Sequence, residues 1–449
     1  MLSNIKTSIV DPMNKLGVFE LAFMTVAGVF MLNTLPLMAV YGFSSVFYYL
    51  FGAILYFIPL AFICAELSSG WPQTGGLYIW IREAFGSRIG FLGIWLEWTN
   101  TVVSFPALLV FIGTTFIYAI NPELANNKYV MLAILLIIFW GLTVLNFFGF
   151  KLSGRMSLIG FILGSLLPIL LLITLSTVWL ALKHPSHIHI DWHLPTFNPK
   201  DSAFLVGLLL GYAGIQITAY HAQDIPNAQK NFPRAILIAV ILMLFISIGG
   251  SLAIAIVVPS QQLNIISGVM QAIALFLTAF HLQGFIPYIA ILITLGLLAM
   301  LNLWVMGPTK GLCISLNQRF THVLVYQAII ITLLSVVYLW MPNIQSAYWV
   351  LIALTALLTF IMNILMFASL LRLRYTQPNI HRAYRIPGKN IGAWIVCVTG
   401  IVVCFGAIIL GFFPPMQLKT GNLFFYETFL MGGIIVIVSV PFLFKTSKS

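Results

Sequence analysis

The sequence predicts an all-α integral membrane protein with twelve transmembrane helices. Of its 449 residues, 61% are hydrophobic and 7% are charged, whereas a soluble domain carries roughly 25% charged residues. The mean hydropathy is +1.05, and the apolar residues form long runs. A membrane-spanning helix needs about 20 such residues, so the chain has room for roughly a dozen spans. A sizeable soluble domain is thereby excluded.

Clusters of charged residues, Pro, Gly and Asn separate the apolar runs. They predict helices, in chain order, near residues 17–41, 43–66, 90–120, 129–149, 157–182, 203–225, 235–258, 286–306, 322–341, 347–371, 391–413 and 424–444. The stretch 262–282 is also apolar, but its flanks are polar. These flanks favour a helical loop over a thirteenth span.

The basic residues support an even number of spans. With twelve spans and a cytoplasmic N-terminus, only four of the 21 Lys and Arg residues fall outside, at Lys128, Lys183, Lys200 and Lys419. Cytoplasmic segments of membrane proteins are enriched in these residues, so both termini are predicted to be cytoplasmic. The net charge of +11 therefore indicates orientation in a lipid bilayer. It does not indicate a nucleic-acid partner.

Cysteines and histidines predict neither a disulfide nor a metal site. The four cysteines form no CxxC pair, and the histidines between the fifth and sixth spans have only one acidic residue nearby, Asp191. These histidines are His184, His187, His189 and His193. We expect no cofactor.

Two predicted helices contain residues that weaken a helix. In the first, Gly28 lies within the apolar run, and Asn33, Thr34 and Pro36 follow it. The sixth has Gly211, Tyr212, Ala213, Gly214 and Gln216. Both contain Ala-Gly followed by a β-branched residue, and they are five helices apart, as in transporters built from inverted repeats. The glycines could instead serve only close helix packing.

A helix broken inside the membrane implies a site. Irregular backbone is tolerated at that depth only where it is buried in protein or lines a cavity. The break exposes N–H groups at one helix end, which suit a carboxylate, and carbonyl groups at the other, which suit an ammonium group. A zwitterionic amino acid fits both.

A family likeness rests on two sets of residues. The run Ala65–Leu67 and residues 71–86 (WPQTGGLYIWIREAFG) resemble the loop after helix 2 in the amino acid–polyamine–organocation superfamily. Segments at 249–259, 264–271, 307–311 and 385–388 resemble its bacterial glutamate/GABA antiporter branch. The resemblance implies a leucine-transporter-type fold, a 5+5 inverted repeat plus two C-terminal helices, that works by alternating access.

The resemblance also implies how the chain is divided. The parts are a cytoplasmic tail (1–16), the first repeat (17–182), an external loop (183–202), the second repeat (203–371, with a helical loop at 260–284), a cytoplasmic basic loop (372–390), and the last two helices with a short cytoplasmic tail (391–449).

The same resemblance implies substrate-binding residues. Thr25, Ala27 and Gly28 would receive the carboxylate. Gly211, Tyr212 and Ala213 would offer carbonyls to the amino group, with Gly214 in the same break. Side-chain pocket candidates are Asn33, Gln216, Met300, Trp304 and Asn363. Met300 stands where the antiporters have a glutamate, so we expect neutral or amide-bearing amino acids, or GABA, in preference to glutamate.

Three ionisable residues are candidates for coupling or gating. Glu97 lies about 10 Å into the third span, where a charge costs roughly 2.5 to 3.5 kcal/mol. It is either a proton-coupling or substrate-facing group or a hydrogen-bonded packing residue. His221 and Asp224, three residues apart on one helix face, form either a gate or a solvated helix end. Without a lysine in the fifth span, exchange or proton coupling is favoured over sodium coupling.

Other functional classes lack their signatures. We find no GxSxG, HExxH or nucleotide-binding loop, so the protein is not expected to be an enzyme. Charge rings or a repeated filter sequence, typical of channels, are also missing. The sequence predicts a secondary active amino acid antiporter of the inner membrane. A proton-coupled symporter and a transporter-like amino acid sensor are the alternatives.

Overall fold

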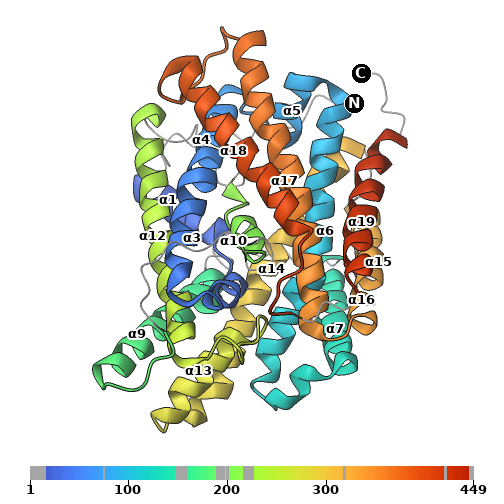
Figure 1. Cartoon of the computed structure of the whole chain (residues 1–449). Helices are drawn as coiled ribbons and strands as arrows, with labels where there is room; N and C mark the ends of the chain where they lie inside the picture. The colour runs from blue at the N-terminus through green and yellow to red at the C-terminus, as the bar shows by residue number, and fades with distance from the viewer. Residues whose placement is uncertain are drawn as a thin grey trace.

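The computed structural model describes residues 17–73, 76–147, 159–188, 198, 202–215, 227–316, 320–418 and 422–443. Every regular element within them is helical, and the long helices run between two ends of the molecule (Figure 1). Ten helices are long and apolar enough to cross a membrane. The pair α1 (Val18–Val29) and η1–α2 (Leu32–Ala39) meets the same test as one bent span. The prediction of an all-helical membrane protein is confirmed.

The helices follow the predicted order. The ten long ones are α3–η3–α4 within Gly42–Gly70, α6 (Ser87–Ile117), α7 (Lys128–Phe147), η5–α9 within Ile159–Ala181, α12 (Ala228–Val257), α14 (Ile286–Leu316), α15–α16 within Phe320–Trp340, α17 (Ile344–Thr376), α18 (Lys389–Gly411) and α19 (Leu423–Leu443). The sixth predicted span is described only in part, as α10 (Leu205–Gly211). The count of twelve therefore stays a prediction.

Two shorter helices lie at opposite ends of the bundle. Helix α13 (Gly268–Ala279) occupies the predicted helical loop. Helix α5 (Leu77–Phe85), which the sequence reading did not include, lies at the other end, beside the start of α6 (Figure 1). We call this end, which carries α5, the end of α17 and the start of α18, the basic end.

Several helices at the basic end are longer than their apolar runs. Helix α17 continues to Thr376, so Arg372 and Arg374 are helical, and the expected basic loop 372–390 shrinks to 377–388. Helix α4 continues past Glu66 to Gly70. The predicted helices end earlier because charged residues bound the apolar runs of the sequence. A charged residue can stay in a buried helix when its charge is paired, as described below.

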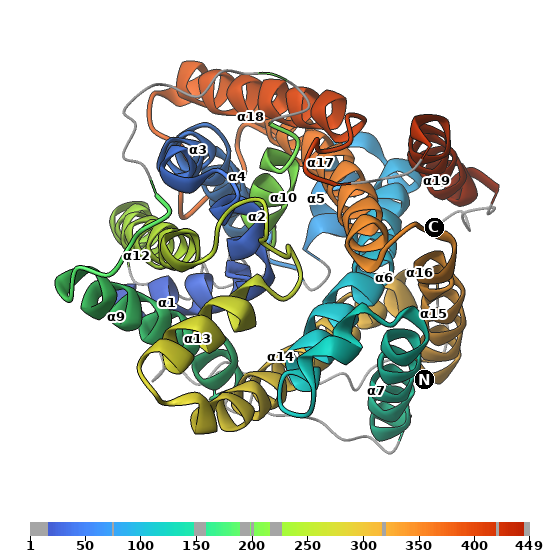
Figure 2. The same cartoon turned by 60° about the horizontal axis from the view of Figure 1, so that its bottom comes forward.

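Helices α6 and α17 form the centre of the bundle. In their most apolar windows, 78% and 83% of the residues are buried, against 11% in α19. Figure 2 shows α1, α9 and α12 on one side of this centre and α7, α15 and α19 on the other. The peripheral helices leave apolar side chains exposed, which in a bilayer would contact lipid.

Glycines let two helices approach each other next to the candidate site. A Cβ atom on Gly296 of α14 would lie 2.3 Å from the backbone nitrogen of Gly164 in η5 (Ile162–Leu166). A Cβ on Gly160 would meet the Gly296 carbonyl oxygen at 2.8 Å. Small residues at helix contacts in membranes permit this backbone proximity.

Candidate functional site

The first transmembrane helix is broken after Val29. Phe30 and Met31 have extended backbones, and the chain resumes at η1 (Leu32–Thr34) with a bend of 57°. The sequence reading centred the break on Gly28, but Gly28 is still inside α1. Pro36 lies at the start of α2 (Leu35–Ala39); because proline has no N–H and its ring clashes with the preceding turn, a continuous helix through Leu32 is disfavoured.

The break exposes both kinds of backbone group. Among the described residues, nothing accepts a hydrogen bond from the N–H groups of Met31, Leu32 or Asn33. Nothing donates to the carbonyls of residues 27–29 either. Helix ends carry a partial positive charge at their N–H groups and a partial negative charge at their carbonyls. The predicted carboxylate ligands Thr25, Ala27 and Gly28 thus lie inside α1, and the free donors come after them.

The end of α10 meets this break. Helix α10 stops at Gly211, a turn follows through Tyr212 and Ala213, and Gly214 has a φ of +102°. A Cβ on Gly211 would lie 3.1 Å from Cγ2 of Thr34. The two interruptions that the sequence paired are therefore in contact. Gln216, His221 and Asp224 lie outside the described residues.

A small cavity of about 40 Å³ lies beside the first break. Its wall includes Phe30 to Asn33, and it continues over α6, η5 and α14 through Leu108, Phe111, Ile112, Ser165, Leu297, Met300 and Leu301. None of these residues is charged, and the Ser165 hydroxyl lies 3.7 Å from the Met300 sulfur. We call it the inner cavity.

The side-chain candidates divide between two places. Asn33 and Met300 line the inner cavity. Asn33 is buried, and its Nδ2 donates to the hydroxyl of Tyr348 on α17 at 2.9 Å. Asn363 is elsewhere, buried between helices, with Nδ2 donating to the Tyr56 hydroxyl at 2.6 Å. Trp304 belongs to α14, and its side chain is outside the described part of the structure.

The Tyr212 side chain is not among the described lining residues of the inner cavity, and it links neighbouring helices. Its hydroxyl donates to the carbonyl of Tyr49 on α3 (Ser45–Gly52) at 3.0 Å. The Tyr49 hydroxyl is 2.9 Å from that of Ser251 on α12, which donates to the Leu35 carbonyl at 3.1 Å. The chain of contacts joins the end of α10 to α3, α12 and α2, so the Tyr212 side chain packs between helices. The predicted role of its carbonyl stays a prediction.

Glu97 lies on α6, partly buried, between Trp95 and Trp98. Neither a hydrogen bond nor an ion pair to its carboxyl is found among the described residues. The adjacent Trp98 donates from its indole nitrogen to Oε1 of Gln327 at 3.2 Å, and the Thr309 hydroxyl donates to the same oxygen at 2.6 Å. These two bonds form a polar cluster between α6, α14 and α15 (Phe320–Ser335).

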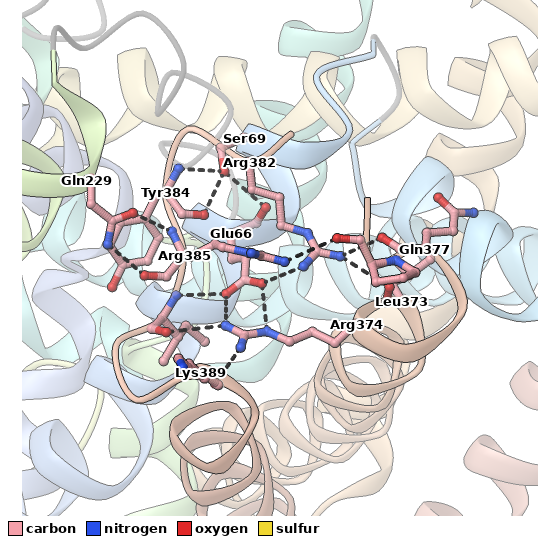
Figure 3. A network of polar contacts seen from close by, with 12 residues as sticks. Glu66, Ser69, Gln229, Leu373, Arg374, Gln377, Arg382, Tyr384, Arg385 and Lys389 are labelled. Atoms are coloured by element: carbon pink, nitrogen blue, oxygen red, sulfur yellow. Dashed lines mark hydrogen bonds and ion pairs between the residues drawn. The ribbon is translucent and has the colours of Figure 1, made fainter. Parts of the chain in front are cut away.

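At the basic end, Glu66 is at the centre of a buried ion cluster (Figure 3). Arg374 donates to it from Nε to Oε1 at 2.8 Å and from Nη2 to Oε2 at 2.5 Å. The N–H of Ile386 donates to Oε2 at 2.8 Å, and Nη1 of Arg382 lies 3.4 Å from Oε1. The glutamate and both arginines are almost fully buried. Residues 308 apart in sequence are thus joined.

The same cluster fixes the segment 377–388 to neighbouring helices. The Ser69 hydroxyl of α4 (Ile58–Gly70) donates to the Tyr384 carbonyl at 3.2 Å. Gln229 of α12 accepts from the Arg385 N–H at 2.8 Å and donates to its carbonyl at 2.9 Å. Burial lowers the pKa of Arg382, although the Glu66 charge opposes this effect. Burial raises the pKa of Tyr384, whose phenol therefore stays protonated.

Sequence reasoning missed this cluster because Glu66 stood at the predicted end of a span. The sequence does contain one signal for it. Leu67, directly after Glu66, is still apolar, so the acid lies inside the apolar run, which ends before Gly70 and Trp71. An acid inside such a run must be paired if the helix is buried.

The comparisons identify the family. A family model described as amino acid permease matches residues 16–313 and 314–438. The chain belongs to the amino acid permease family. An uncharacterized transporter of Legionella pneumophila is 41% identical to this permease, over 96% of each chain. A glutamate/gamma-aminobutyrate antiporter of Lactococcus lactis is 28% identical, over 96% of this permease and 90% of the relative.

A third relative, a probable agmatine/putrescine antiporter of Lactococcus lactis, is 22% identical over 94% of this permease and 93% of its own length. The predicted resemblance to the superfamily is confirmed by the family match, which covers most of the permease. Its relatives are transporters, so this permease is a multi-span membrane transporter and not an enzyme.

Proposed function

We propose that this permease is an amino acid antiporter that works by alternating access and binds its substrate where α1 gives way to η1. One observation carries the proposal: the free N–H groups of Met31, Leu32 and Asn33 belong to residues that line the inner cavity. The free carbonyls at the end of α1 lie just before them. A carboxylate and an ammonium group would each find backbone partners there without a charged side chain.

The lining of the inner cavity supports a neutral substrate side chain. Burying a carboxylate without a partner is costly, and among the described lining residues only Asn33 and Ser165 have polar side chains. Met300, which has an uncharged side chain, also lines the inner cavity. We therefore favour neutral or amide-bearing amino acids, or GABA, over glutamate. Ligand pockets for small molecules are commonly about 300 Å³ or more, so binding here requires the roughly 40 Å³ cavity to open.

We propose that the basic end faces the cytoplasm of the inner membrane and that the two breaks are equivalent positions in a 5+5 inverted repeat. Described basic residues at this end are Arg82, Arg88, Lys230, Arg234, Arg372, Arg374, Arg382, Arg385 and Lys389, against Lys128 and Lys183 at the other. The positive-inside rule favours this orientation. The Glu66 cluster then closes the cytoplasmic side by joining α4, α17 and the segment 377–388.

Proton symport is the second candidate, because Glu97 lies in α6 without a described partner. Ionisable groups inside the membrane commonly mark proton or substrate paths. Glu97 would gain and lose a proton during the transport cycle. This candidate uses the same site for the amino acid.

Exchange is tested with purified permease in proteoliposomes preloaded with one amino acid at a time, at two external pH values and with or without sodium. We expect uptake of a labelled neutral amino acid or GABA only into vesicles that contain an exchange partner. Uptake into empty vesicles driven by a pH gradient would replace exchange by proton symport. Failure of every amino acid and amine to exchange or accumulate would overturn the transporter assignment.

A further inference from the structure

A second, larger cavity lies at the end opposite the basic end. It has a volume of about 150 Å³ and is bounded by the end of α6, by η4 (Pro122–Asn126), by the start of α7, by residues near 264–266 and by the start of α17. We call it the outer cavity. It is several times larger than the inner cavity and is lined largely by polar side chains.

Among the described residues that line the outer cavity, one is charged, Lys128. An ammonium group has three donor hydrogens. One of them binds the Met341 carbonyl, and no partner for the other two is found among the described residues. No acidic residue is among the described residues of the lining. The cavity therefore has a positive charge with unused donors.

The carboxamide groups in the lining also present donors. Oδ1 of Asn264 accepts from the N–H groups of Ile266 and Ser267, at 2.9 and 3.2 Å. Oε1 of Gln345 accepts from the Ile265 N–H at 3.1 Å. Because a backbone N–H can only donate, each of these amides must direct its oxygen toward the backbone. The NH₂ groups of the two side chains remain for a ligand.

A further amide of the lining, Asn343, follows the same pattern just before the start of α17. Its Oδ1 accepts from the Ser346 N–H at 2.8 Å and from the Ser346 hydroxyl at 2.9 Å. The N–H groups of Ile344 and Gln345, in the first turn, have no described acceptor. The positive end of this 33-residue helix therefore adds to the charge of Lys128.

Helix α6 lines both cavities, and α17 connects the outer cavity to the helix break. On α6, Thr114 lines the outer cavity and Phe111 the inner one, three residues or about 4.5 Å apart along the axis. On α17, Gln345 lines the outer cavity. Tyr348, three residues further, binds Asn33 at the break. The outer cavity therefore lies about one helical turn beyond the inner cavity.

From this geometry we propose that the outer cavity is a second binding site, for the carboxylate of an amino acid, occupied before the substrate reaches the helix break. The inference rests on the proposed function for its ligand. A carboxylate is an acceptor with a negative charge. It matches a site that offers an ammonium group, the NH₂ groups of Asn264, Asn343 and Gln345, and a helix N-terminus. In the proposed orientation the site faces the exterior.

Equilibrium dialysis of the purified full-length permease tests the site. The probes are labelled L-glutamine and GABA, with acetate and inorganic phosphate as competitors. We expect two classes of binding for at least one probe, and Lys128→Met should weaken one class about tenfold or more, since a hydrogen bond to a charged group is lost. Acetate should compete for that class.

Two further variants separate charge from structure. Lys128→Arg should retain both classes, because it keeps the charge and the donors. Lys183→Met makes the same change as Lys128→Met at another position of this end, outside the cavity lining, and should also retain both. The carboxylate site would be overturned if Lys128→Met bound both classes of probe as tightly as the parent protein does. It would also be overturned if phosphate competed as well as acetate.

Failure of the inference is distinguishable from failure of the proposed function. Exchange in proteoliposomes with no Lys128-dependent binding of either probe would overturn the outer site alone. Lys128-dependent binding without exchange of any amino acid would overturn the transport proposal and leave the site standing. Absence of both results would overturn both.

Discussion

At the scale of single residues, Glu66 should matter most for stability. Glu66→Gln removes the negative charge that faces Arg374 and Arg382, and both guanidinium groups would remain buried. Breaking a buried ion pair by removing one partner costs about 3–5 kcal/mol, because the remaining charge is unpaired. We expect much less monodisperse protein after a heat step, measured by size-exclusion chromatography in detergent.

The matched control is Arg82→Gln. Arg82 also pairs with a glutamate, Glu83, at 2.8 Å, but their side chains are 36% and 29% exposed. Exposed pairs contribute about 1 kcal/mol or less. If Arg82→Gln and Glu66→Gln lost equal amounts of protein in the heat step, burial would not be the source of the effect.

Glu97 is the residue for which we predict an effect on pH dependence. A carboxyl without a described counter-charge inside a transmembrane helix can exchange a proton as the site opens. Glu97→Gln should flatten the pH dependence of amino acid uptake, measured in proteoliposomes between about pH 4 and pH 8, a range that starts near the ordinary pKa of a glutamate, about 4.3. Glu427→Gln, at an exposed position of α19, should behave like the parent. If Glu97→Gln had the same uptake rate and the same pH dependence as the parent protein, Glu97 would have no role in coupling.

At the scale of elements, the close contact between α14 and η5 positions residues of both helices that line the inner cavity. Gly296→Ala would place a methyl group 2.3 Å from the Gly164 nitrogen, and both sides of the contact are backbone. Overpacking costs roughly 1–3 kcal/mol. Here no side chain can rotate to relieve the contact, because the atoms on both sides belong to the backbone. We expect reduced yield and reduced thermal stability in the size-exclusion assay.

Gly141→Ala supplies the comparison. Gly141 is on α7, and nothing lies within 4 Å of the position its Cβ would take. Alanine in a helix interior is favoured over glycine by about 1 kcal/mol, so this variant should be as stable as the parent or more so. Equal losses in Gly296→Ala and Gly141→Ala would mean that the tight contact is not responsible.

The elements also show what the sequence could predict. Long apolar runs must become helices in a bilayer, because backbone groups have no water to bind, and this constraint located the long spans. It could not locate helix ends where charges are paired by distant residues. Arg374 continues α17 because Glu66, far away in sequence, neutralises it. The pairing is a property of the tertiary structure.

The candidate site was predictable at the same coarse level. Glycine and proline near residues 28 and 36 indicated a break, and the break exists. Its position, after Val29, and the free N–H groups at Met31 to Asn33 depend on how α2 packs against α10 and α12. Tyr348 and Ser165 carried no sequence signal, since a tyrosine or a serine in an apolar run is ordinary. Only the fold brings them to Asn33 and Met300.

At the scale of the whole molecule, the proposed orientation gives the last prediction. Asn379 lies exposed in the segment 377–388 at the basic end, and Glu123 lies exposed in η4 at the opposite end. Because basic residues gather in cytoplasmic segments, Asn379→Cys should be cytoplasmic and Glu123→Cys external. Each is made in a background with Cys64, Cys313, Cys397 and Cys404 replaced.

A membrane-impermeant thiol reagent then reports the orientation in intact cells. Glu123→Cys should label before permeabilisation, and Asn379→Cys only after it. The cysteine-free background should not label in either condition. The reverse labelling pattern would mean that the orientation is opposite to the proposed one. The outer cavity would then face the cytoplasm, and the Glu66 cluster would close the external side. Binding at the helix break does not depend on which end is cytoplasmic and would survive that inversion. The order in which a substrate meets the two cavities would be reversed.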